Sequence, residues 1–199
     1  QTIGDAHCEA ETLWLMGRAR LGLGELAESQ ALLDDALDRV RRIRDRDDEF
    51  RVQTDRAATL RARGALGESL AAADEAVRLA DALGSIDGLA AARIERALTL
   101  LALGRRVDAA PDAAQAVALA DASGSGLRWL AHWALARILL SSGSRDDHAS
   151  GLAHLHQAVS LAHGIRAQLD PDNQERWRLA SAALGGPERD LEQARRLEF

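Results

Sequence analysis

The sequence predicts an all-α fold in which about four helical hairpins stack into a solenoid. Three observations lead to this prediction: a helix-favouring composition, an internal repeat, and a glycine that recurs inside each repeat. Apolar residues make up 47% of the 199 residues but aromatic residues only 3%, and there is no Tyr. A β-sheet protein usually contains more aromatic and β-branched residues. Ala, Leu, Arg and Glu are abundant, and all four favour helix.

The repeat is visible as a short shared motif. It occurs as EAVRLAD at 75–81, QAVALAD at 115–121, QAVSLAH at 157–163 and, more loosely, DALDRV at 35–40. The alanine common to all copies lies at positions 36, 76, 116 and 158, so the spacings are 40, 40 and 42. Such a period is typical of a repeat array, in which neighbouring units bury a continuous core that no single unit can bury alone.

Two small-residue positions divide each repeat into a hairpin. A glycine precedes the shared alanine by 12 residues in the first three repeats and by 15 in the fourth, at Gly24, Gly64, Gly104 and Gly143. Glycine can end a helix in the left-handed conformation. Seven residues before each glycine lies another small residue: Gly17, Ala57, Ala97 or Ala136. These positions should let the two helices of a hairpin approach closely. The longer fourth spacing places about three inserted residues near 145–148.

These landmarks give the expected organisation. The first helices should span about 6–22, 49–62, 87–103 and 127–142, and the second helices about 25–43, 66–83, 106–122 and 148–164. The repeats are then 6–43, 49–83, 87–122 and 127–164. Residues 165–199 should form a C-terminal cap. In it, Asp170 caps a helix that begins at Pro171 and runs to about Leu184, and Pro187 begins a last short helix.

Composition limits the classes of function. The 25 basic residues are all Arg, as expected for a high-GC bacterial genome, and the net charge of −6 disfavours a general nucleic-acid binder. The single Cys8 excludes an intrachain disulfide and favours a reducing compartment, so a cytoplasmic location is expected. No apolar run approaches the length of about 20 residues that spans a membrane. We expect residues 1–199 to form one domain, and, because the chain begins with Gln1, to be part of a longer protein.

The small residue, the hairpin glycine and the second small residue twelve positions later resemble tetratricopeptide repeats (TPRs). The clearest copy is Leu13–Leu37, and the resemblance covers residues 6–164. The period is near 40 residues rather than about 34, and the usual proline after the second helix is missing. In its long repeat the chain is similar to kinesin light chains and to bacterial regulators of the maltose-activator type. The resemblance implies a right-handed TPR-like superhelix.

The resemblance also implies where a partner binds, because the first helices of successive TPRs line a concave groove. One row of equivalent positions is Trp14, Thr54, Ile94 and Trp133. A second row, one turn on, is Arg18, Ala58, Leu98 and Arg137, and neighbouring candidates are Glu11, Arg51, Asp55 and Glu95. Exposed Trp and Arg are frequent binding hot spots. The set expected to bind a partner is Trp14, Arg18, Arg51, Thr54, Asp55, Ile94, Glu95, Trp133 and Arg137. The alternative is that both Trp residues pack between helices, and that Arg18 and Arg137 simply lie on a solvent-exposed helix face.

Other clusters have structural explanations. The five Arg residues within 39–46 end a helix, where they complement its dipole. His148, His154, His156 and His163 do not share one helix face at metal-binding distance. Cys8 is expected to be a buried, inert thiol, and Trp129 to lie in the core. Neither a catalytic residue, a metal site nor a cofactor is expected.

The leading functional hypothesis is a protein–protein interaction scaffold of a bacterial signalling or regulatory protein. Its partner would be a protein or peptide, or another domain of the same polypeptide, and neither nucleic acid nor membrane. The alternative is a ligand-sensing regulatory domain of a transcriptional regulator or signalling ATPase. An enzyme is the third possibility, and only the His cluster favours it.

Overall fold

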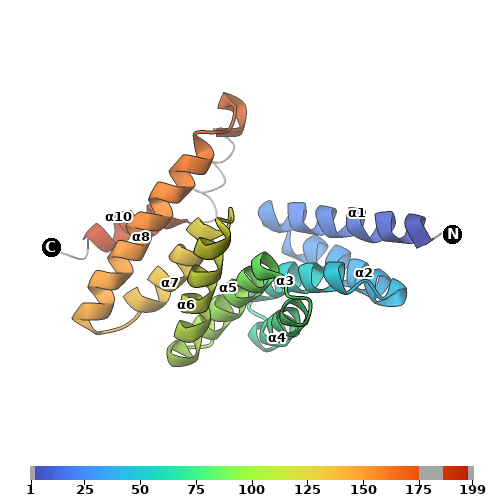
Figure 1. The fold of residues 1–199 in the computed structure, drawn as a ribbon, viewed down its shortest axis with the longest axis horizontal. Helices are drawn as coiled ribbons and strands as arrows, with labels where there is room; N and C mark the ends of the chain where they lie inside the picture. The colour runs from blue at the N-terminus through green and yellow to red at the C-terminus, as the bar shows by residue number, and fades with distance from the viewer. Residues whose placement is uncertain (1–2, 175–185, 197–199) are drawn as a thin grey trace.

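The computed structural model describes residues 3–174 and 186–196, and its regular structure there is helical and arranged in antiparallel pairs. The helices are α1 (Ile3–Gly22), α2 (Leu26–Ile43), α3 (Arg46–Ala62), α4 (Leu66–Ala82), α5 (Ile86–Ala102), α6 (Arg106–Ser123), α7 (Arg128–Leu140), α8 (Arg145–Arg166) and α10 (Pro187–Arg196). Figure 1 shows the hairpins following one another from the N-terminus on the right to the C-terminus on the left. No described helix is both long and apolar enough to cross a membrane.

The helix ends lie within three residues of the expected bounds. Helices α1, α3 and α8 begin three residues earlier than expected, and a side chain caps each of the last two. The Asp45 carboxylate accepts a hydrogen bond from the Asp48 amide at 3.1 Å and starts α3. The Ser144 hydroxyl accepts from the Asp147 amide at 3.4 Å and starts α8. The inserted residues of the fourth repeat therefore lengthen α8 rather than its preceding turn.

The C-terminal part begins as expected. Asp170 accepts a hydrogen bond from the Asn173 amide at 3.0 Å, and residues 171–174 are helical. The expected continuation to Leu184 lies outside the described residues. Helix α10 begins at Pro187 and packs against α8, beside which it lies in Figure 1.

Three of the four predicted hairpin glycines take the left-handed conformation. The φ angles of Gly24, Gly64 and Gly104 are 77°, 80° and 75°. Gly143 does not have a positive φ. In that turn the Ser142 hydroxyl accepts a hydrogen bond from the Ser144 amide at 3.1 Å. The Ser142 side chain thus stabilises the turn of the fourth hairpin, whereas a left-handed glycine forms the turn in the first three.

The small residues mark the closest approach of the paired helices, as predicted. Ala57, Ala97 and Ala136 are fully buried. The Ser69 hydroxyl of α4 reaches the Ala57 carbonyl of α3 at 2.8 Å. A Cβ atom added to Gly17 would lie 2.8 Å from Cγ of Leu33 on α2, which is shorter than normal van der Waals contact. Larger side chains at these positions would separate the helices.

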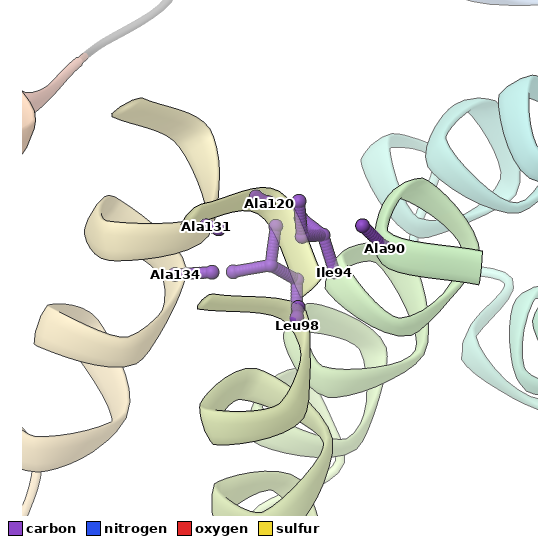
Figure 2. Close-up of a cluster of buried hydrophobic side chains, with 7 residues drawn as sticks. Ala90, Ile94, Leu98, Ala120, Ala131 and Ala134 are labelled. Carbon is purple, nitrogen blue, oxygen red and sulfur yellow. The ribbon is translucent and has the colours of Figure 1, made fainter. Parts of the chain in front are cut away.

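The largest core cluster lies between the third and fourth hairpins (Figure 2). It contains Ala90, Ile94 and Leu98 of α5, Ala116 and Ala120 of α6, and Ala131 and Ala134 of α7. The buried apolar residues of α6 are all alanine. The larger side chains of α5 therefore fill the space that α6 leaves open.

Hydroxyl pairs join successive hairpins inside the core. The hydroxyl oxygens of Ser29 on α2 and Thr59 on α3 are 3.0 Å apart, and those of Ser69 on α4 and Thr99 on α5 are 2.8 Å apart. All four residues are fully buried. Because each buried hydroxyl needs a partner, the pairs fix how the second hairpin sits on the first and the third on the second.

The role of close approach can be tested with two substitutions in one helix. Gly17→Ala should lower the free energy of unfolding by about 1–2 kcal/mol, since the added methyl group overpacks Leu33. Gly22→Ala, with nothing within 4 Å of its Cβ, should leave stability unchanged or raise it by up to about 1 kcal/mol through helix propensity. Urea denaturation followed by circular dichroism measures both. Equal stabilities of the two variants would contradict the packing argument.

Candidate functional site

The first helices of the hairpins line a hollow of about 350 Å³ on the inner side of the array. Its walls come from α1, α3, α5 and the start of α7. The lining residues are Trp14, Arg18, Phe50, Arg51, Thr54, Asp55, Ser85, Asp87, Gly88, Ala91, Glu95, Leu127 and Leu130. We call this hollow the inner groove. It contains most of the predicted partner-binding residues, whereas Glu11 is exposed outside it.

Trp14 and Asp55 form the central contact of the inner groove. The Trp14 indole Nε1 donates a hydrogen bond to Asp55 Oδ2 at 2.7 Å, which connects α1 to α3. The Arg51 guanidinium lies 6.0 Å from the centre of the Trp14 ring, at the limit of a cation–π contact. Trp14 is half-buried, so part of its ring still faces the groove. It therefore both joins two repeats and contributes to the surface.

Asp55 has a pKa of about 6, well above its ordinary value of 3.8. Burial is the largest cause, because it disfavours the charged carboxylate. The Trp14 hydrogen bond and the positive charge of Arg18 act in the opposite direction, and Glu95 adds a small upward shift. Asp55 is thus a groove carboxylate that titrates close to neutral pH.

The other charged groups of the groove differ in whether the protein already pairs them. Glu95 forms an ion pair with Arg61 at 2.8 Å, and Asp87 accepts a hydrogen bond from the Ser123 hydroxyl at 2.7 Å. Arg51 pairs with Asp47 at 2.7 Å. Arg18 is exposed and has no hydrogen bond or ion pair with any described residue. Arg18 is therefore the groove cation that is available to a bound molecule.

Thr54 and Phe50 shape the wall on α3. The Thr54 hydroxyl donates to the Phe50 carbonyl at 2.8 Å, so it is satisfied within its own helix. The Phe50 ring packs so closely on Gly88 that a Cβ there would lie 2.5 Å from the ring. No sequence pattern indicates this contact, because Phe50 and Gly88 are distant in the chain and only the stacking of α3 and α5 brings them together.

Ile94 does not line the groove, and its expected role there is wrong. It is fully buried in the cluster of Figure 2, and Leu98 of the second row is 3% exposed in the same cluster. The alanine-rich α6 explains the difference, since the α5 side chains turn toward the space it leaves. In the third repeat the inner groove is instead formed by Ala91 and Glu95.

Trp133 and Arg137 lie at the other end of the array and contact the C-terminal helix. The Trp133 indole Nε1 donates to Asp190 Oδ2 on α10 at 2.8 Å. The Arg137 guanidinium lies 5.0 Å from the Trp133 ring centre and 3.9 Å from Asp190. Leu191 packs in the same cluster as Trp133. The structure therefore separates these two residues from the groove around Trp14.

Two further expectations are corrected. Cys8 is exposed rather than buried. It lies on α1, three residues before the start of the exposed stretch Glu11–Thr12. Trp129 is half-buried rather than a core residue.

The Arg-rich segment behaves as a solvated helix end, as expected. Arg39 pairs with Glu9 at 2.6 Å, and Arg41 and Arg46 both pair with Glu49, at 2.8 and 2.9 Å.

The four clustered histidines have separate partners. The His154 Nδ1 lies 2.8 Å from the Nδ1 of His132, and His163 lies 2.6 Å from Glu188. His156 Nδ1 contacts the Leu152 carbonyl at 2.8 Å. His148 lines a hollow of about 330 Å³ beside α10, away from the other three. The described residues therefore do not bring the four rings together.

The fold and the groove define an α-solenoid of stacked helical hairpins. Within that class the chain is a TPR-like repeat domain, as comparison with solved structures shows. No protein-family model matches the chain, and no curated protein sequence matches it. The fold is therefore recognised from structure rather than from sequence similarity.

Three similar structures illustrate the fold. The apo form of RapI is 13% identical over 96% of this chain, with a TM-score of 0.66, and the chain spans about half, 52%, of RapI. A Rap protein complexed with competence and sporulation factor is 15% identical over 98% of this chain and 65% of its own, with a TM-score of 0.64. A kinesin light chain of Podosopora anserina with nearly identical TPR-like repeats is 17% identical over 94% of both chains, with a TM-score of 0.62.

The pKa of Asp55 predicts how stability depends on pH. The folded protein keeps the Asp55 proton between pH 3.8 and about 6, where the unfolded chain has lost it. Raising the pH through this range therefore costs the folded state up to about 3 kcal/mol, and the cost is complete above the folded pKa. Asp55→Asn keeps an acceptor for Trp14 and removes the titration. We expect the wild type to lose stability relative to this variant between pH 4 and pH 7, as measured by urea denaturation.

Because all other titrating groups are the same in the wild type and in Asp55→Asn, their contributions cancel in the stability difference between the two proteins. A stability difference that stays constant over that pH range would contradict the burial of the Asp55 carboxylate.

Proposed function

We propose that the chain is a protein-interaction module that binds an extended or helical peptide segment in its inner groove. The observation that carries the proposal is the combination of a half-exposed Trp14 ring with the unpaired cation of Arg18 in one hollow. Aromatic and Arg side chains contribute most to binding at protein interfaces. The apolar side chains of Leu127 and Leu130 extend the surface at the α7 end.

The charges of the groove indicate what the segment contains. The acidic groups Asp55 and Glu95 are already occupied by Trp14 and Arg61, whereas Arg18 is not. A segment with an acidic residue next to an apolar one would pair its carboxylate with Arg18 and place its apolar side chain on Trp14. Charge-assisted hydrogen bonds of this kind are stronger than neutral ones. An acidic, amphipathic peptide is therefore the favoured partner.

The comparisons support a binding role at the level of fold. One neighbour is a Rap protein in complex with competence and sporulation factor, and the TPR-like neighbours are interaction modules. In our proposal this chain is likewise a non-enzymatic scaffold, one domain of a longer bacterial signalling or regulatory protein in the cytoplasm. It works as a four-repeat array closed by its C-terminal residues, and binds neither nucleic acid nor membrane.

The proposed binding residues follow from the geometry. They are Trp14, Arg18, Arg51, Thr54, Asp55 and Glu95. Trp133 and Arg137 are assigned to the contact with α10 instead, since Asp190 occupies both side chains.

Reversing the charge of Arg18 tests the proposal. Peptides selected from a displayed random library should contain an acidic residue beside an apolar one. Their affinity, measured by fluorescence anisotropy, should fall at least about tenfold in Arg18→Glu, because one charge-assisted contact contributes about 1.5–3 kcal/mol. Arg42→Glu is the matched control, since Arg42 is exposed on the outer helix α2 and lies outside the groove.

Two outcomes would count against peptide binding in the groove. One is a selection that yields no binder, and the other is a selected peptide that binds Arg18→Glu as well as it binds the wild type. A thermal-shift screen in which a small metabolite, rather than any peptide, stabilises the wild type but not Arg18→Glu would favour the ligand-sensing alternative.

A further inference from the structure

A second cluster of chemically active groups lies where the N-terminal part of α1 meets the start of α3. His7 Nδ1 lies 3.2 Å from Asp45 Oδ2 and 3.5 Å from Asp48 Oδ2. The three atoms all lie within 4.8 Å of one another. None of the three residues lines the inner groove. The cluster is thus separate from the proposed binding site.

The Asp48 carboxylate is the unusual member of this cluster. Asp48 is 5% exposed, and its carboxylate oxygen Oδ2 is buried and has no hydrogen-bond partner among the described residues. The other oxygen, Oδ1, lies 3.7 Å from the Arg51 guanidinium. A buried polar atom without a partner is costly, and more so when it is charged. Oδ2 is directed at the space between His7 and Asp45, which is where a missing partner would sit.

The distances are close to those between two ligand atoms of one metal ion. A charge-assisted hydrogen bond from a protonated histidine to a carboxylate is about 2.7–2.9 Å long. Both distances from His7 exceed that. Zinc binds His nitrogen and carboxylate oxygen at about 2.0–2.2 Å in a tetrahedron, which places neighbouring ligand atoms about 3.3–3.6 Å apart. The observed 3.5 Å lies within this range, and the observed 3.2 Å lies just below it.

The local charge also favours a cation. The two carboxylates together carry up to two negative charges, whereas the positive end of the α3 dipole is equivalent to about half a charge. The nearby cation Arg51 lies 3.7 Å from Asp48 but is paired more closely with Asp47, at 2.7 Å. The two carboxylate oxygens of Asp45 have different contacts. Oδ1 accepts the Asp48 amide at 3.1 Å and is held by the helix end, and Oδ2 remains directed at His7. Fixing one carboxylate oxygen in this way orients the other as a ligand.

We propose that His7, Asp45 and Asp48 form a binding site for a divalent ion of the zinc class, with a fourth position open to water. One imidazole with two carboxylates suits zinc and its neighbours in the transition series, whereas magnesium and calcium prefer more oxygen ligands. The ion would connect α1 to the start of α3 and so tie the first hairpin to the second. The His7 side chain is 44% exposed, which lets the ion enter from solvent.

Zinc titration of the metal-free protein tests this site. We expect one Zn²⁺ per chain by isothermal titration calorimetry, and a rise in melting temperature on adding ZnCl₂. Co²⁺ should give the visible absorption of a tetrahedral site. His7→Ala and the isosteric Asp48→Asn should each weaken zinc binding by at least about tenfold and abolish the rise in melting temperature.

Two control variants separate this site from surface binding. Cys8→Ser removes the exposed thiol next to His7, and His156→Ala removes an exposed imidazole on α8. Both should bind zinc as the wild type does. His7→Ala keeps the proposal testable if Asp48→Asn unfolds, because His7 is partly exposed and Asp48 keeps its contact with Arg51 in this variant. Absence of zinc binding by the wild type, or unchanged binding by His7→Ala, would overturn the proposal.

Discussion

The close approach of the two helices in each hairpin is the constraint on which the rest of the structure depends. Small residues at 17, 57, 97 and 136 let each second helix press against its first helix, and the contact leaves no space for a Cβ at Gly17. Because the most extensive contacts lie within hairpins and between consecutive helices, the first helices come to lie next to one another along the inner side. The groove is a consequence of this stacking rather than of any single loop.

Tryptophan–aspartate contacts connect that inner row at both ends. Trp14 donates to Asp55 on the next first helix, and Trp133 donates to Asp190 on α10. Helix α10 also packs on α8. The same pair of residue types thus lines the inner groove at one end of the array and joins α7 to α10 at the other.

Much of the fold could be predicted from sequence, because a 40-residue period and the hairpin glycines are local signals. The groove was predictable only in part. Register alone placed Trp14 and Arg18 among the residues that line the hollow, but it failed for Ile94, since the side-chain volume of the neighbouring α6 decides which way α5 faces. Long-range pairs such as Trp133 with Asp190 or His7 with Asp48 have no sequence signature. They depend on how helices distant in the chain are stacked.

Amide hydrogen exchange with a selected peptide bound tests most directly whether the inner row of helices is the binding surface. We expect the peptide to slow exchange in α1, α3 and α5, which line the groove, and to leave exchange in the outer helices α2, α4 and α6 unchanged. Protection confined to the outer helices, or protection centred on α10, would contradict it.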